Sequence, residues 1–197
     1  MAKKNHVVIT GAGPVGCISA LILAKAGVYV TLLEAESDLP LDMRASTFHP
    51  PTLDMLDELG IVQKVISQGL ITPKFQYRDR QEGLIAEVDM TAISEFTKHP
   101  YRVQAEQYNL TRIISDSLRD YPHVEQKFDA RATSLEQDDS SVTVHFDTPG
   151  GPQSISADYL MSCDGSRSFA RKTLNIGFPG FTYPELFMVV STTDEIT

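Results

Sequence analysis

The feature that most constrains the fold of this chain is a glycine-rich turn at residues 11–16, which have the sequence Gly-Ala-Gly-Pro-Val-Gly. A short β-branched run, His6 to Thr10, precedes the turn, and an apolar stretch from Val15 to Ala26 follows it. A second apolar run extends from Val28 to Leu33. Strand, helix and strand in this order, with uninterrupted apolar strands, are typical of a parallel sheet covered on both faces. The sequence therefore predicts an α/β fold.

The turn has the G-x-G-x-x-G spacing of a dinucleotide-binding motif. Gly11 permits the tight turn, Gly13 lets a pyrophosphate approach the backbone, and Gly16 lets the helix pack against the strand. Pro14 suits the first helical turn. Glu34 closes the second strand, 18 residues beyond Gly16, where a carboxylate can accept both ribose hydroxyls of an ADP group and would repel a 2′-phosphate. The motif predicts a site for NAD or FAD and not for NADP.

Helical spacing recurs further along the chain. Leucines three residues apart follow Pro50 and Pro51 and predict a helix over 52–59, which Gly60 ends. A shorter helix is predicted over 62–66, and apolar residues between Leu110 and Leu118 predict a helix over 106–119. The run 124–128 is predicted to be a strand that returns to the parallel sheet.

Two other regions alternate apolar and polar residues, as antiparallel strands do. Phe75 and Tyr77 on one side of a Gln-Glu-Gly turn, and Leu84, Ala86 and Val88 on the other, predict a hairpin. Three short runs, 133–137, 142–146 and 153–157, predict a three-stranded meander. Strands are also expected at 159–162 and 187–190.

The stretch from Asp158 to Arg171 predicts a strand, a turn and a helix. Gly165 allows close approach to the backbone, and Asp164 can orient an amide or a water toward a phosphate. Ser168 is placed to cap the helix that follows. Any three of these residues would fit an ordinary capped turn, but the whole stretch of charged start, apolar strand, Asp-Gly and S-x-x-R is more specific.

With these motifs the sequence resembles the single-component flavoprotein monooxygenases, the para-hydroxybenzoate hydroxylase-like family. The resemblance rests on the glycine turn with Glu34 and on Asp164-Gly165, which in that family touches both FAD and the reducing nicotinamide cofactor. It extends from His6 to about Val190. The Gly-Asp pair that the family carries far downstream is absent from these residues, so we expect the chain to be an N-terminal part of such an enzyme.

The resemblance also implies roles for residues outside the two motifs. Arg44 is similar to the family arginine at the FAD diphosphate and ribose, and Gln104 lies where the family places a glutamine against the flavin. His49, in a loop that the family brings toward the flavin ring, is a candidate neighbour of flavin or substrate. The predicted cofactor-binding residues are Gly11, Gly13, Pro14, Val15, Gly16, Glu34, Ala35, Arg44, Gln104, Asp164 and Gly165.

The family's chemistry defines the expected function. NAD(P)H reduces FAD, O₂ adds to the reduced flavin to give a C4a-hydroperoxide, and one oxygen passes to an aromatic, phenolic substrate. Because the flavin carries this chemistry, no protein nucleophile is expected. A non-catalytic FAD- or ADP-binding module, and a flavin reductase or halogenase of the same fold, are the alternatives.

The resemblance and the strand patterns together predict two domains. Residues 1–72 and 101–180 are assigned to an FAD-binding domain with a parallel sheet and the antiparallel meander. Residues 73–100 and 181–197 are assigned to the beginning of a second, antiparallel substrate domain. The unpaired strand edges of this second part favour self-association, so we expect a homodimer or a larger assembly.

Charge and cysteine content limit the partners. The 197 residues carry 17 basic and 26 acidic side chains, a net charge of -9, which argues against nucleic acid or an anionic membrane as a partner. Cys17 and Cys163 form neither a disulfide framework nor a metal site, and Cys17 is expected to pack a helix. No apolar run is long enough to span a bilayer, and a cytoplasmic location is expected. The remaining histidines lack ligand spacing and are expected at the surface: His6, His99, His123 and His145.

Overall fold

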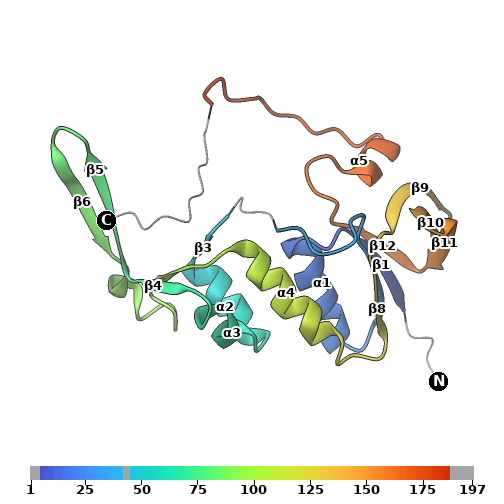
Figure 1. The fold of residues 1–197 in the computed structure, drawn as a ribbon, viewed down its shortest axis with the longest axis horizontal. Helices are drawn as coiled ribbons and strands as arrows, with labels where there is room; N and C mark the ends of the chain where they lie inside the picture. The colour runs from blue at the N-terminus through green and yellow to red at the C-terminus, as the bar shows by residue number, and fades with distance from the viewer. Residues whose placement is uncertain (1–4, 42–44, 187–197) are drawn as a thin grey trace.

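The computed structural model describes residues 5–41 and 45–186 (Figure 1). A four-stranded parallel sheet, with strand order β12-β1-β2-β8, lies between a layer of helices and an antiparallel meander. Its strands are β1 (His6–Thr10), β2 (Tyr29–Leu33), β8 (Val124–Lys127) and β12 (Tyr159–Ser162). The α/β fold predicted from the glycine turn is confirmed.

Successive side chains of the central strands point to opposite faces of the sheet, and both faces are covered. Val7 and Ile9 of β1 belong to the core shared with the helices. Val8, between them, belongs to a second core shared with the meander. Burial on both faces explains why β1 and β2 are continuous apolar runs in the sequence.

The helices lie on one side of the sheet and share one hydrophobic core with it (Figure 1). They are α1 (Pro14–Lys25), α2 (Pro50–Glu58), α3 (Val62–Ile66) and α4 (Gln107–Leu118). α1 and α2 both begin with proline, which has no N–H to leave unpaired in the first turn. α1 ends before Gly27, whose φ of 74° is readily adopted by glycine. These four helices agree with the predicted ones to within two residues at each end.

An antiparallel meander covers the other face of the sheet. Its strands are β9 (Arg131–Gln137), β10 (Val142–Thr148) and β11 (Gly151–Ala157). Val142, Val144 and Phe146 alternate along β10 and pack against the sheet. The predicted meander is confirmed. After β12 the short helix α5 (Phe169–Thr173) leads into an extended segment that runs away from the sheet (Figure 1).

A second small sheet has no counterpart in the sequence prediction. It contains β3 (Thr47–Phe48), β7 (Arg102–Gln104) and β4 (Leu70–Thr72), in the order β3-β7-β4. Strands of two or three residues are too short to show an alternating pattern. They form here because segments far apart in the chain meet beside α2 and α4.

The predicted hairpin is present and projects from the body of the molecule (Figure 1). It is formed by β5 (Lys74–Asp79) and β6 (Gly83–Asp89), with Phe75 opposite Val88 and Tyr77 opposite Ala86. The 3₁₀ helix η1 (Met90–Ile93) follows it. The strand predicted at 187–190 lies outside the described residues.

The surface location predicted for His99 is wrong. Its side chain is buried, and its Nδ1 lies 2.7 Å from Oδ1 of Asp54 on α2. Its ring also meets that of Tyr101 edge to face. No sequence spacing indicated this, because Asp54 and His99 are separated by 45 residues.

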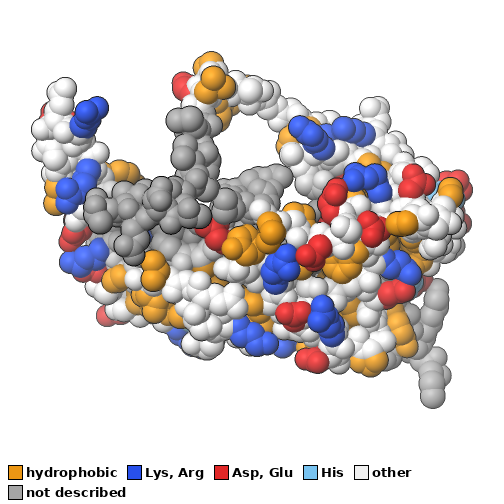
Figure 2. Space-filling view, in the orientation of Figure 1, with side chains coloured by type: hydrophobic (Ala, Val, Ile, Leu, Met, Phe, Trp, Pro, Cys, Tyr) orange, Lys and Arg blue, Asp and Glu red, His pale blue; other side chains and the backbone are white. Residues whose placement is uncertain are grey.

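The visible face of the molecule carries mixed charges, and none of the described helices could span a membrane. Acidic and basic side chains are interspersed over the face seen in Figure 2. In residues 5–41 and 45–186, every helix is too short or too polar to cross a bilayer.

Candidate dinucleotide site

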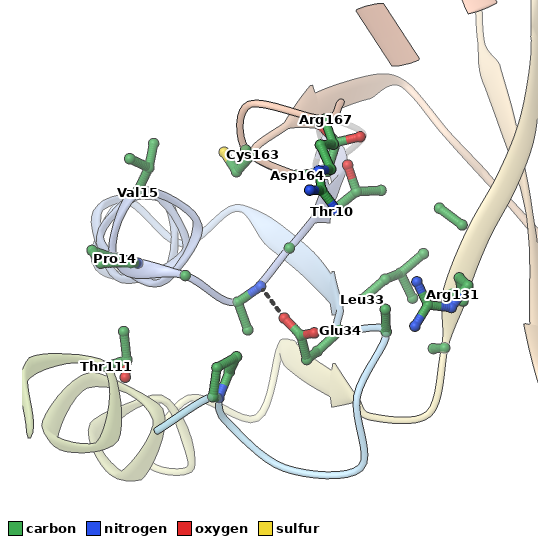
Figure 3. Close-up of a pocket in the computed structure, with 18 of the residues that line it drawn as sticks. Thr10, Pro14, Val15, Leu33, Glu34, Thr111, Arg131, Cys163, Asp164 and Arg167 are labelled. Carbon is green, nitrogen blue, oxygen red and sulfur yellow. Dashed lines mark hydrogen bonds between the residues drawn. The ribbon is translucent and has the colours of Figure 1, made fainter. Parts of the chain in front are cut away.

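A cavity of about 500 Å³ opens at the carboxyl ends of the central strands (Figure 3). Backbone hydrogen bonds hold these strand ends together: Gly11 N–H donates to Leu33 O at 2.7 Å, and Cys163 N–H donates to Thr10 O at 2.8 Å. In open α/β sheets this edge is where ligands bind. The glycine turn, the end of β2 and the Asp164-Gly165 turn therefore face one space.

The three glycines of the turn differ in what their missing side chains permit. Gly11 has a φ of 91°, and a Cβ there would lie 2.6 Å from the carbonyl oxygen of Cys163. A Cβ on Gly16 would lie 1.9 Å from the carbonyl oxygen of Gly11. Gly13 has an ordinary φ of -68°, and the described protein places nothing within 4 Å of a Cβ there. Packing and backbone conformation explain Gly11 and Gly16, whereas Gly13 leaves open space in the cavity wall.

The first turn of α1 faces that open space. Its backbone N–H groups have no partner within the helix, because the first helical hydrogen bond is donated by Cys17 N–H to Gly13 O, at 2.9 Å. No acidic residue lies in this turn. Free N–H groups at the positive end of a helix dipole are suited to an anion such as a pyrophosphate.

Glu34 lies directly after β2 with 7% of its surface exposed. Its Oε2 accepts from Ala12 N–H at 2.7 Å (Figure 3), and its Oε1 accepts from Glu36 N–H at 3.1 Å. These bonds fix the carboxylate beside the glycine turn. Each oxygen keeps a further lone pair, so the group can still accept hydrogen bonds from a ribose diol.

The carboxylate of Asp164 is engaged within its own loop. Ser162 Oγ–H donates to its Oδ1, and Phe169 N–H donates to its Oδ2 at 2.6 Å. Desolvation raises the pKa of this carboxyl group, but hydrogen bonds from Ser162, Ser168 and Phe169 outweigh it and leave the pKa below its ordinary value. Ser168 also caps α5 by accepting from Arg171 N–H, as predicted. The charge of Asp164 thus stabilises the loop that forms one side of the cavity.

The structure brings most of the predicted cofactor residues together and separates a few. Those that line the cavity are Gly11, Gly13, Pro14, Val15, Glu34, Ala35, Asp164 and Gly165. Gly16 lies behind the turn, where it permits close packing. Gln104 lies in β7 away from the cavity lining, and its Oε1 accepts from Thr47 Oγ1–H at 2.7 Å. His49 is exposed at the start of α2, and Arg44 lies outside the described residues.

Several residues that line the cavity have no recognisable motif in the sequence and were not predicted. The first turns of α4 contribute Gln107, Tyr108 and Thr111, the segment after β8 contributes residues 130–132, and Arg167 follows the Asp-Gly turn. One signal was available for residues 130–132. The prediction that β8 returns to the parallel sheet places its carboxyl end at the same edge as Glu34.

The donor and acceptor groups at this site suit a neutral sugar and a phosphate. Oγ1 of Thr10, on the cavity wall, is buried without a hydrogen-bond partner among the described residues. Burial raises the pKa of the Cys17 thiol to about 12, in keeping with a packing role. Within residues 5–41 and 45–186, no cluster of three or more His, Cys, Asp or Glu is arranged to hold a metal ion. Open space at Gly13, a helix N-terminus and a carboxylate with free lone pairs fit the ADP half of FAD.

The fold and the cavity together define an α/β dinucleotide-binding domain. A family model described as "FAD binding domain" matches residues 4–197, and the chain belongs to that family.

Relatives of the chain are named as monooxygenases. It is 37% identical over 185 residues to para-nitrophenol 4-monooxygenase of Pseudomonas sp. (strain WBC-3), an alignment that covers 94% of this chain and 46% of the relative. It is 33% identical over 193 residues to 6-hydroxy-3-succinoylpyridine 3-monooxygenase HspB of Pseudomonas putida (strain DSM 28022 / S16), covering 98% of this chain and 49% of the relative. The chain thus spans about half the length of these relatives.

Two solved structures with a similar fold are also named as a monooxygenase and a hydroxylase. The crystal structure of p-nitrophenol 4-monooxygenase PnpA from Pseudomonas putida DLL-E4 matches with a TM-score of 0.88 and 34% identity, covering 91% of this chain and 45% of that chain. Aklavinone-11 hydroxylase, solved with FAD and aklavinone, matches with a TM-score of 0.78 and 26% identity, covering 90% and 36%. The fold is that of FAD-dependent aromatic hydroxylases.

Proposed function

We propose that this chain provides the FAD-binding part of a monooxygenase that uses NAD(P)H and O₂ to hydroxylate a small aromatic, phenolic substrate. The observation that carries the proposal is the contrast among the three glycines. A side chain on Gly11 or Gly16 would clash with the protein backbone, whereas the space in front of Gly13 is free for a ligand. The family and the names of the relatives support FAD and an aromatic substrate.

Different residues of the cavity bind different parts of FAD. The first turn of α1 binds the pyrophosphate through backbone N–H groups, with Gly13, Pro14 and Val15 in contact with it. Glu34 accepts hydrogen bonds from the adenosine ribose, beside Ala35. Asp164 shapes the turn from which the backbone of Gly165 approaches the cofactor.

The flavin end of the site rests on the family resemblance. We assign Arg44 to the diphosphate and ribose region, Gln104 to the flavin side, and His49 to the neighbourhood of flavin or substrate. When bound, FAD supplies the redox chemistry by which O₂ is activated with electrons from NAD(P)H. The protein orients the cofactor and limits the access of water to it.

The wider assignment follows the same resemblance. We assign residues 1–72 and 101–180 to the FAD-binding domain, and residues 73–100 and 181–197 to a substrate domain. We further propose that the protein acts in the cytoplasm as a homodimer. Exposed apolar side chains on the β5–β6 hairpin, including Tyr77 and Leu84, support self-association.

The variant Gly13→Val tests the cofactor site directly. A side chain there would occupy the space assigned to the pyrophosphate, so we expect the Kd for FAD and for ADP to rise at least about 100-fold, or about 2.8 kcal/mol. The melting temperature should stay unchanged, because the described protein leaves room for the side chain. Gly180→Val, which also meets nothing within 4 Å, is the matched control. Unchanged affinity of the Gly13 variant for both ligands would contradict the proposal.

Turnover tests the reaction class. In the enzyme of which this chain is proposed to be a part, with FAD bound, NAD(P)H oxidation that rises when a phenol is added supports a monooxygenase. Oxidation that is independent of any phenol would instead indicate a flavin reductase. FAD binding without any NAD(P)H oxidation would indicate a binding module and contradict the proposed reaction.

A further inference from the structure

Beyond Glu34 the cavity continues to a rim formed by two backbone segments. Ala130 N–H donates to Glu34 O at 2.8 Å, and Asp129 N–H donates to Glu36 O at 2.9 Å. These bonds join the loop after β2 to the segment between β8 and β9. The rim is therefore fixed relative to the Glu34 carboxylate.

Small side chains line this end of the cavity. They are those of Ala35, Ala130 and Ala132. Arg131 is the long side chain between them, and Figure 3 shows its guanidinium turned toward Leu33 and Glu34. Arg167, the other arginine of the cavity lining, lies beside Asp164 and Thr10 (Figure 3).

The partner of Arg131 holds it only weakly. Its Nη2 lies 2.9 Å from Oε1 of Glu36, and the two side chains are 62% and 63% exposed. Ion pairs with this exposure contribute little to stability because water and salt screen them. The guanidinium can therefore leave Glu36 at small cost.

We infer that Arg131 binds the adenine ring of the cofactor by stacking its guanidinium on the ring face. This inference rests on the proposed FAD site. With the pyrophosphate at Gly13 and the ribose on Glu34, the base leaves the ribose on the side away from the phosphates, which is the rim formed by residues 34–36 and 129–132. A guanidinium is planar and weakly hydrated, and it stacks on aromatic rings.

Arg131 would then determine affinity for the base and not for the phosphates. This distinguishes it from a residue that attracts the ligand by charge alone. It also distinguishes it from a structural partner of Glu36, because the Glu36 ion pair would be exchanged for the stacked ring on binding.

The experiment compares ADP with ribose 5-diphosphate, which is ADP without its base. For Arg131→Ala we expect the Kd for ADP to rise three- to tenfold, or about 0.6–1.4 kcal/mol, with the Kd for ribose 5-diphosphate unchanged. Arg131→Lys should recover only part of the loss, since an ammonium group has no planar face. Glu36→Gln, the matched control, removes the ion pair but keeps Arg131, and should bind ADP as tightly as the parent or more tightly.

A fluorescent adenine analogue gives an independent signal. Bound 1,N6-etheno-ADP should emit differently in the parent and in Arg131→Ala, because a stacked guanidinium excludes water from one face of the ring.

Three results would overturn the inference. Equal weakening of ADP and ribose 5-diphosphate in Arg131→Ala would show that the charge acts on the phosphates. Unchanged ADP binding would show that Arg131 serves only Glu36. A parent chain that binds neither FAD nor ADP would refute the proposed function itself, and the inference with it.

Discussion

The central sheet and the β5–β6 hairpin are both well formed, but they are stabilised in different ways. Strands β1 and β2 are buried on both faces between helices and meander. The residues of β5 and β6 are exposed or half-buried. One face of the hairpin is apolar, whereas the other carries the Lys74 ion pairs with Glu87 and Asp89.

This difference shows that an alternating pattern predicts a strand but not what covers it. The hairpin's apolar face, with Tyr77 and Val88, has no core within the described residues, and two-stranded sheets are only marginally stable by themselves. Its base is held by the body of the molecule, where the guanidinium of Arg102 lies 3.9 Å from the centre of the Phe75 ring. Substitutions should therefore destabilise the sheet region strongly and the hairpin weakly.

The largest expected effect is that of Gly16→Ala. The added Cβ would lie 1.9 Å from a backbone oxygen, so α1 must move away from β1, and we expect a loss of about 4 kcal/mol in the free energy of unfolding. In Gly83→Ala, in the hairpin, the added Cβ meets no atom within 4 Å. Only the positive φ of 79° is unfavourable for alanine, so the free energy of unfolding should fall by about 1 kcal/mol. Denaturant unfolding measures both, and equal losses would show that packing at the turn is looser than described.

Truncation of a core side chain should come next. Ile114 of α4 is fully buried, so Ile114→Ala should cost about 2–4 kcal/mol through lost burial and the cavity left behind. Leu84 is 50% exposed, so Leu84→Ala should cost less than about 1 kcal/mol. A comparable loss for Leu84 would mean that its face is covered in solution, and sedimentation would then reveal a dimer.

The Asp54 carboxylate, which binds the segment that follows the hairpin, should make a smaller and pH-dependent contribution to the free energy of unfolding. Hydrogen bonds from the Thr97 side chain, and then from His99, hold the pKa of Asp54 below its ordinary value. A carboxyl group with a lower pKa in the folded state stabilises fully above the unfolded pKa of about 4, and this contribution is lost as pH falls through the folded pKa. Asp54→Ala should cost about 1–2 kcal/mol at pH 7.

The control for Asp54→Ala is the same comparison in acid. The difference between parent and variant in free energy of unfolding should shrink as the pH falls below 4. A difference that stays constant with pH would show that the charge of Asp54 contributes nothing.

The smallest effect is expected from the exposed ion pairs of the hairpin. Lys74 contacts Glu87 at 3.0 Å and Asp89 at 3.7 Å, but water and salt screen these charges. Lys74→Gln should leave the melting temperature unchanged within measurement error at 0.15 M salt. A clear drop that vanishes in 1 M salt would show that these charges hold the hairpin together.

The sequence determined the central fold because its signals are local. Gly11, Gly13 and Gly16 act through backbone conformation and close approach within a few residues, and the apolar strands beside them show their burial directly. The position of Glu34 directly after the second strand was enough to predict its place in the cavity. The residues of one strand–turn–helix–strand unit therefore predicted one half of the cavity.

The tertiary structure alone decided what meets that unit from elsewhere in the chain. Strand order places Ala130 and Arg131 beside Glu34, nearly a hundred residues away, and helix packing turns Gln107 and Tyr108 toward the glycine turn. Asp54 and His99, and the three strands of the β3-β7-β4 sheet, likewise meet only on folding. Such contacts leave no periodic pattern in the sequence, because each depends on the packing of two segments and not on the conformation of either one.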